Sequence, residues 1–280
     1  CQPAVKINIG AKHNYYVEAA DFWQHFPSSI STTKELTALS LLGAKKSDQQ
    51  ELQPGEQLTR RVILSPDRLT AFNATLNPMW VKESNALPFT PFNANEEFQA
   101  LIQQGVQGKR SFFAKRDEID EYGWRHFGEL YADHEKALAP DEPFFVSHYN
   151  NQYDPLCGML NQWLVTGDLR WNTLADDLAK HVANIDVYHT TKDKPEYSGG
   201  LFWHTDHYVQ AHTATHRTYS KNQPSGVYED HAGGGGPGGQ HCYTNGLLHH
   251  YLLTGSDVSK QALLSICNWI ENYYEGDGTI

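Results

Sequence analysis

The chain has 280 residues and a mass of 31.7 kDa, which is enough for one large domain or two ordinary ones. Its formal net charge of −11 leaves no general cationic surface to release the counterions of nucleic acid, so nucleic acid is not an expected partner. No stretch approaches about 18 apolar residues, so the sequence predicts no membrane span.

The first part of the chain, residues 1–95, has the pattern of β-structure. Apolar and polar residues alternate through Val5, Ile7 and Ile9, and a second strand-like run covers 57–64. Turn signals made of Gly, Pro and Asn recur between such runs, which is typical of a sandwich or barrel. We therefore predict an antiparallel β-sandwich or barrel over 1–95, which could be truncated.

Residues 96–146 are a predicted connecting segment with extended structure. One short helix is expected at 96–104. The aromatic runs 111–113 and 122–124 are expected to be extended, with an acidic turn between them.

From residue 147 to the end we predict a helical domain built from hairpins. Apolar residues recur at helical spacing through 155–165 and 169–188, and Gly167 and Asp168 suit a helix end followed by an N-cap. A similar hairpin with Gly255 at its turn follows at 247–274. Repeated hairpins stack into solenoids or close into α/α toroids, because one hairpin cannot bury its own apolar face. The alternative is chance recurrence of a common turn.

The predicted fold class is therefore α+β and multidomain, with an N-terminal antiparallel β-sandwich or barrel followed by α-hairpin repeats of an incomplete α/α toroid. Two hairpins are too few to close a ring. We expect either that the chain is part of a longer protein or that neighbouring copies complete it as a homo-oligomer.

The four cysteines form no CxxC pair, so a zinc ribbon or thioredoxin-like site is not expected. Free thiols, with at most one joined pair, are the simplest interpretation. Cys1 has a second interpretation, since a mature bacterial lipoprotein starts with a lipid-modified cysteine. No charged segment followed by an apolar one stands at the start, so we expect any export signal to have been removed or never included.

The segment between the two hairpins carries most of the candidate chemistry. It is too long for a plain helix connection, and it is rich in imidazole and phenol groups. His204, Asp206 and His207 could share a divalent metal, with zinc the best match for these donors. Two alternatives stay open for the same residues, a metal-free acid–base cluster and histidines that only bond the backbone.

A second polar and aromatic cluster at 147–154 precedes the first hairpin. Asp154 before Pro155 suits an N-cap with proline at the first helical position. The cluster would then lie at a helix mouth, where toroids place ligand sites. A polar turn that only closes the hairpin is the alternative.

These groups favour β-elimination on a uronate polysaccharide. The reaction needs a group that neutralises the carboxylate, a base for the C5 proton and an acid for the leaving oxygen. The candidate catalytic residues are His204, His207, His216, Tyr208, Tyr219 and Tyr149. The candidate substrate-binding residues are Asn150, Asn151, Arg217, Trp203, His148, His241 and Tyr243. Hydrolysis would instead need two carboxylates, for which Asp206, Glu229 and Asp230 are available.

Several runs of the sequence resemble one known family. The runs are 112–125, 131–135, 149–154, 202–208 and 215–220. They look like a group of large bacterial proteins that resembles the exo-rhamnogalacturonan lyase-like family, and the resemblance covers about residues 21–279. It implies a RIFT-type β-barrel, a β-sandwich and an α/α toroid, and it implies an exported, polysaccharide-degrading lyase. The implied location is periplasmic or extracellular.

Three interpretations therefore stay open. The first is a lyase that acts on an acidic polysaccharide. The second is a glycoside hydrolase on a toroid, with Asp206 or Glu229 essential. The third is a glycan-binding or self-assembling protein without catalysis.

Overall fold

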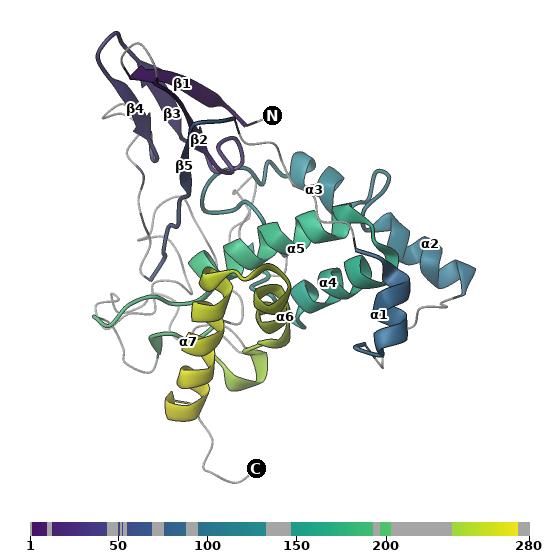
Figure 1. The fold of residues 1–280 in the computed structure, drawn as a ribbon. Coiled ribbons are helices and arrows are strands. Elements are labelled where there is room, and N and C mark those ends of the chain that lie inside the picture. Colours follow the sequence, from purple (N-terminus) through teal and green to yellow (C-terminus); the bar gives the residue numbers. More distant parts are fainter. Residues whose placement is uncertain are drawn as a thin grey trace. The chain divides into compact units, whose positions relative to one another are not determined.

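The computed structural model describes residues 2–9, 13–43, 50, 52, 55–68, 76–87, 95–132, 147–192, 197–202 and 237–273. The chain forms two compact units, which are described separately. The first consists of Cys1–Glu51, Leu58–Ala74 and Tyr122–Phe127. The second consists of Leu52–Gln57, Thr75–Glu121 and Gly128–Ile280. Small antiparallel sheets and a set of helices make the fold mixed α+β, as the sequence predicts (Figure 1).

The first unit holds a three-stranded antiparallel sheet in the order β1-β2-β5, with β1 at Ala4–Ile9, β2 at His13–Ala19 and β5 at Val62–Ser65. A separate hairpin joins β3 (Ser29–Thr32) to β4 (Thr37–Ser40). The strand-like run predicted at 57–64 is shorter than expected, because only its last part pairs with β2. A small core of Ala19, Phe22, Trp124 and Phe127 is buried in this unit.

The second unit begins with three short helices, each with a side-chain N-cap. They are α1 at Pro78–Ser84, α2 at Glu96–Gln104 and α3 at Phe112–Glu118, capped by Asn77, Asn95 and Ser111. The helix predicted at 96–104 is confirmed. The prediction of extended structure at 111–113 is wrong. The Ser111 hydroxyl accepts a hydrogen bond from the Ala114 N–H and starts a helix there. Residues 122–124 form no strand either, since Gly123 lies in a bend and Trp124 in a turn.

Two helical hairpins follow, as the periodicity predicts. The first joins α4 (Pro155–Thr166) to α5 (Leu169–His181), and the second joins α6 (Asn245–Thr254) to α7 (Asp257–Tyr273). Gly167 and Gly255 end α4 and α6 with φ angles of 72° and 71°, a left-handed conformation that glycine adopts without strain. Asp168 caps α5 as expected.

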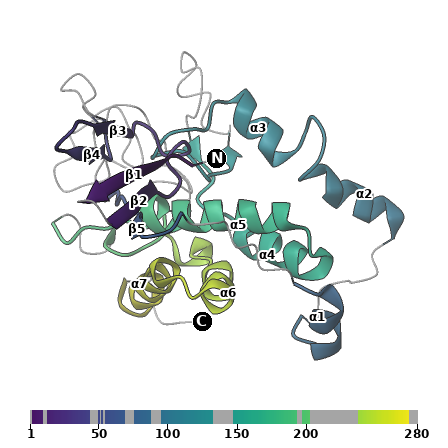
Figure 2. The ribbon, with the colours of Figure 1, turned by 45° about the horizontal axis from the view of Figure 1, so that its top comes forward.

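The two hairpins pack on one another through α4 and α6 and through α5 with both α6 and α7. Figure 2 shows α6 beside α7 and α4 beside α5. The shared core is made of Leu156, Leu160, Leu174, Leu178, Leu247, Ala262 and Ile266, among others. The core therefore crosses the hairpin boundary, which is how repeated hairpins gain stability.

The end of α5 departs from the predicted helix over 169–188. The α-helix stops at His181, and a π-helical turn covers Val182–Asp186. The backbone is then extended, with bridges joining Val187 to Leu201 and Phe202 to Pro237. A second short pairing joins β6 (Tyr131–Ala132) to β7 (Ser147–His148).

Among the described residues, no helix combines the length and apolar character that crossing a membrane requires. Cys157, Cys242 and Cys267 are free thiols. Cys1 lies outside the described residues.

Candidate functional site

Most of the residues predicted as catalytic lie in 203–236, outside the described residues. This applies to Trp203, His204, Asp206, His207, Tyr208, His216, Arg217 and Tyr219, and to the hydrolase candidates Glu229 and Asp230. The backbone of His148 lies in β7. The structure therefore bears on the remaining candidates, Tyr149, Asn150, Asn151, His241 and Tyr243.

The loop before α4 has an unusual backbone. Asn150, Asn151, Tyr153 and Asp154 all have positive φ angles, between 53° and 61°. Asn and Asp tolerate this left-handed region, but it is uncommon for a tyrosine. Four such residues in five positions persist only where the surrounding structure holds them, and such strain is concentrated at functional sites.

Asp154 holds this loop in place. Its Oδ1 accepts hydrogen bonds from the Cys157 N–H (3.2 Å) and the Asn151 side chain (3.3 Å), and its Oδ2 accepts one from the Gly246 N–H (3.0 Å). Asn151 Oδ1 in turn accepts from the Leu156 N–H (3.2 Å). The predicted N-cap at Asp154 is confirmed, and it joins the first turns of α4 and α6.

The buried side of the loop is committed to the protein. Asn150 and Asn151 are both 0% exposed. The Asn150 side chain donates to the Phe202 carbonyl (3.1 Å), and that of Asn151 binds Asp154. This differs from the predicted role of the two amides in substrate binding, because both face the interior.

The other side of the loop carries an aromatic group that we call the Tyr–His patch, made of Tyr149, Tyr153, Tyr243 and His241. The rings of Tyr153 and Tyr243 lie 6.1 Å apart, and those of His241 and Tyr243 lie 6.3 Å apart. Tyr153 is 72% exposed. Tyr149 lies near enough to Tyr153 and Tyr243 for both to affect its pKa. Tyr149, from one part of the sequence, thus comes together with His241 and Tyr243 from another, and Tyr153 joins them.

The surroundings of the patch move two pKa values apart. Burial, with Tyr153 and Tyr243 nearby, raises the pKa of the Tyr149 phenol. Partial burial lowers the pKa of His241. At neutral pH the first group is therefore a protonated phenol and the second a neutral imidazole, which is the arrangement that one acid and one base require.

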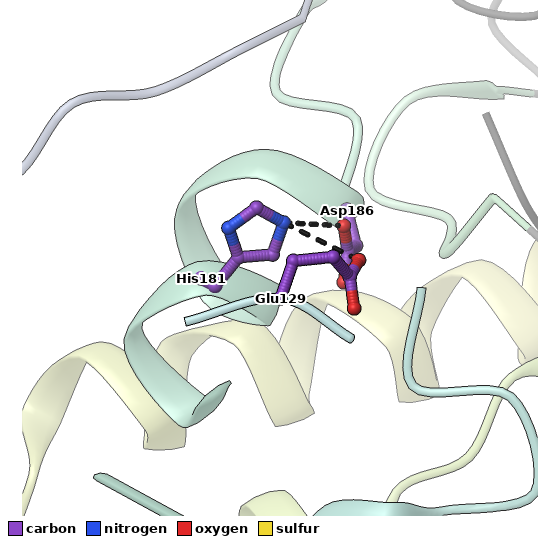
Figure 3. Close-up of side chains that lie close together, drawn as sticks. All are labelled: Glu129, His181 and Asp186. Carbon is purple, nitrogen blue, oxygen red and sulfur yellow. Dashed lines mark ion pairs between the residues drawn. The ribbon is translucent and has the colours of Figure 1, made fainter. Parts of the chain in front are cut away.

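A second cluster of chemical interest is fully buried beneath the loop. His181 Nε2 lies 3.4 Å from Glu129 Oε2 and 3.3 Å from Asp186 Oδ1 (Figure 3). All three side chains are 0% exposed, and their ligand atoms lie within 4.8 Å of one another. We call this the buried triad. A group of this composition could hold a metal ion.

The π-helical turn builds the triad. His181 and Asp186 are five residues apart, and an α-helix would place them about 140° apart around its axis. The turn instead closes on a hydrogen bond from the Val187 N–H to the Val182 carbonyl (3.1 Å), which brings residues five apart to one side. Glu129 joins from the segment before β6, where its Oε2 accepts from the Asn150 N–H (3.0 Å).

Burial and charge act together on the triad. Burial and the Asp186 carboxylate raise the pKa of Glu129. Burial alone would lower the pKa of His181, but the carboxylates of Asp186 and Glu129 outweigh it and raise the pKa to about 10. The protein thus favours positive charge at this position.

A third group of buried charges lies close by. Arg116 binds Glu121 Oε1 through Nε and Asp177 Oδ2 through Nη1, both at 2.9 Å. Glu121 Oε1 also accepts from the Gly128 N–H (2.9 Å). Burial raises the pKa of Glu121 to about 7 and that of Asp177 to about 6, despite the nearby arginine. A hollow of about 20 Å³ beside Arg116, Glu121 and Glu129 is large enough for one water.

Two further side-chain clusters connect the helices of the two hairpins, and neither offers an activated nucleophile. His250 Nδ1 lies 2.8 Å from Ser259 Oγ, and its Nε2 lies 3.4 Å from Asp176 Oδ1. Ser259 is only 1% exposed, so this serine cannot reach a substrate. Cys157 Sγ lies 3.8 Å from His249 Nδ1, and burial raises the pKa of the thiol, which disfavours a nucleophilic thiolate.

The buried triad was not predicted from the sequence. Glu129 lies in a stretch without periodicity, and His181 falls on the apolar face of the helical pattern over 169–188, where a buried histidine is no sign of a metal. A histidine on a buried face with an aspartate five residues later is the one signal that could have indicated it.

Comparison with known proteins adds no family. No known family model matches this chain, and no curated protein matches its sequence significantly.

Proposed function

We propose that this chain is a carbohydrate-active protein that cleaves an acidic, uronate-containing polysaccharide by β-elimination. The observation that carries the proposal is the Tyr–His patch on the strained loop before α4. Aromatic faces suit the C–H face of a sugar ring, and phenol and imidazole groups can move protons.

Within this proposal, His241 takes the C5 proton and Tyr149 protonates the leaving oxygen. The direction of each pKa shift supports these roles, because His241 is kept neutral and Tyr149 is kept protonated. Tyr153 and Tyr243 provide the surface on which a sugar ring rests. Substrate binding was the role expected of His241 from the sequence, and the base role is new.

The group that neutralises the substrate carboxylate must come from elsewhere. The amides of Asn150 and Asn151 are occupied inside the protein. Arg217 is the proposed partner, although it lies outside the described residues. Zinc bound by His204, Asp206 and His207 stays a prediction for the same reason.

The fold expectations belong to the same proposal. The packed hairpins, with α4 and α6 starting at one shared cap, are compatible with successive units of an α/α toroid. We propose the toroid, the β-sandwich or barrel, and membership of the exo-rhamnogalacturonan lyase-like group on the sequence resemblance. An exported location is proposed on the same resemblance, and a homo-oligomer because two hairpins are too few to close a ring.

The test is incubation with pectic, algal and glycosaminoglycan polymers while the absorbance of a C4–C5 double bond is followed. We expect activity on at least one uronate polymer, reduced about 100-fold or more in Tyr149→Phe and in His241→Gln. Tyr251→Phe, on α6 outside the patch, and His13→Gln, exposed on β2, are the matched controls and should retain activity. Saturated products alone would contradict elimination and favour the hydrolase.

A glycan-binding function without catalysis is the second candidate. The exposed ring of Tyr153 against Tyr243 specifically favours it, because such a surface can hold a sugar without any proton transfer. Binding of a polymer that is lost in Tyr153→Ala, with no product formed, would support this function over the lyase.

A further inference from the structure

We infer that Glu129, His181 and Asp186 bind one divalent transition-metal ion of the zinc class, as a buried site that holds the loop before α4 in place. The inference does not depend on the proposed function. It also differs from the metal position expected from the sequence, which involved His204, Asp206 and His207.

The two distances from the imidazole to the carboxylates fit ligands around an ion better than hydrogen-bonded partners. Hydrogen bonds between a charged imidazole and a carboxylate are about 2.7–2.9 Å long. The observed separations are 3.4 Å to Glu129 and 3.3 Å to Asp186. Ligands at about 2.0–2.1 Å from a tetrahedral zinc ion are about 3.3–3.4 Å from each other.

The direction of the imidazole supports the same conclusion. One nitrogen of His181, Nε2, faces both carboxylates (Figure 3). A single N–H cannot point straight at two acceptors, whereas one ion can bind all three atoms.

Asp186 provides an independent observation. Its side chain is fully buried, and neither carboxylate oxygen has a hydrogen-bond partner among the described residues. A buried carboxylate without hydrogen bonds is costly, and one bound to a metal is not. A protonated imidazole between two carboxylates would leave a net charge of −1 in the interior, whereas a divalent ion with neutral imidazole leaves none.

The donor set selects the ion. One imidazole with two carboxylates suits zinc and its first-row neighbours. Calcium prefers six to eight oxygen ligands, and the described residues around this site supply only two carboxylates. Three protein ligands leave one tetrahedral position for a water.

The ion would act on the loop through Glu129. The Glu129 carboxylate that faces His181 also accepts the Asn150 N–H, and Asn150 is the first left-handed residue of the loop. Fixing Glu129 therefore fixes the start of the loop, including the position of Tyr149. Hydrogen bonds to metal ligands commonly orient such sites.

The first test measures the wild-type chain. We expect about one metal ion per chain by elemental analysis, a fall in the thermal midpoint on treatment with a chelator, and recovery with Zn²⁺ but not Ca²⁺. Co²⁺ should give the visible absorption of tetrahedral coordination. X-ray absorption of the zinc form should show one imidazole with oxygen ligands. A stripped protein that gains no stability from Zn²⁺ and gives no Co²⁺ spectrum would overturn the inference, as would a site of two or more imidazoles.

The second test uses variants that preserve shape. Asp186→Asn should weaken Zn²⁺ binding about 100-fold or more, measured by competition with a chromogenic chelator. Asp177→Asn, a buried acid on α5 outside the triad, and His250→Gln, a buried histidine, are controls that should bind as wild type does. If Asp186→Asn binds Zn²⁺ as wild type does and His207→Ala loses Zn²⁺ binding, the metal site lies in the segment between the hairpins and the buried site is refuted. If Asp186→Asn does not fold, the spectra of the wild type still decide.

Discussion

The carboxylate of Asp154 accepts a hydrogen bond from the backbone N–H of Gly246, 92 residues further along the chain. The same carboxylate caps the first turn of α4 through Cys157. One side chain therefore ties together the starts of two helices that belong to different hairpins.

Asp154→Ala should destabilise the protein by about 2–3 kcal/mol, because the first turns of both helices lose an acceptor for a part-buried N–H group and alanine is strained at the φ of 55°. Asn95→Ala, which removes the cap of α2 alone, should cost about 1 kcal/mol. Urea unfolding of both variants measures the difference. Equal losses would mean that the bond to Gly246 contributes nothing.

Gly128→Ala should be much more harmful than Gly108→Ala. Both glycines have positive φ angles, 99° and 87°, so alanine is strained at either position. A Cβ at Gly128 would lie 2.3 Å from the Asp177 carbonyl oxygen, whereas one at Gly108 meets nothing within 4 Å. We expect about 1 kcal/mol for Gly108→Ala and at least about 2 kcal/mol more for Gly128→Ala. The difference between the two variants in thermal unfolding measures the cost of the clash between the added Cβ at position 128 and the backbone of α5.

Stability should fall between pH 5 and pH 8 through Glu121. Its pKa is raised to about 7 in the folded protein from the ordinary value of 4.5, so the folded state holds the proton more tightly. That contribution, at most about 3 kcal/mol, is complete below pH 4.5 and lost as pH rises through 7. Glu121→Gln should lose this part of the pH dependence. Unfolding midpoints of the variant and the wild type are measured at pH 5 and pH 8 with a chelator present. An equal change in midpoint in both proteins would rule out Glu121 as the source of the pH dependence.

Elimination should show a broad bell-shaped pH profile if His241 and Tyr149 are its base and acid. Activity should fall at low pH only below the ordinary imidazole pKa of 6.5, because the pKa of His241 is lowered and the base must be unprotonated. It should fall at high pH only above 10, because the pKa of Tyr149 is raised and the acid must keep its proton. Turnover against pH measures both limbs. The low-pH limb should disappear in His241→Gln, and a limb that persists there belongs to another group.

Local signals in the sequence predicted much of the helical unit. Gly167 and Gly255 mark helix ends, and Asp154 with Pro155 marks a helix start, because each conformation is set by the residue itself. At 111–113 two adjacent phenylalanines favoured a strand, but the cap from Ser111 decided for a helix. The side chain of the preceding residue outweighed β-propensity.

The candidate site was only partly predictable. Tyr149, His241 and Tyr243 could be named as ring-bearing candidates, but their proximity depends on the packing of two hairpins. Asn150 and Asn151 have the right chemistry for a carboxylate, yet the left-handed loop turns both inward. The contact between His181 and Asp186 could not be predicted from the sequence, because a regular α-helix would place residues five apart on different faces.

Because of the π-helical turn, the geometry of the buried triad depends on the number of residues between His181 and Asp186 as well as on their identity. The turn from Val182 to Asp186 contains one residue more than an α-helical turn. Deleting Ala183 would leave His181 and Asp186 four positions apart, and a regular α-helix places such residues only about 40° apart around its axis. A homologue with a regular helix could therefore keep the same three donors only if it lacked this extra residue, with the imidazole and the aspartate four positions apart instead of five.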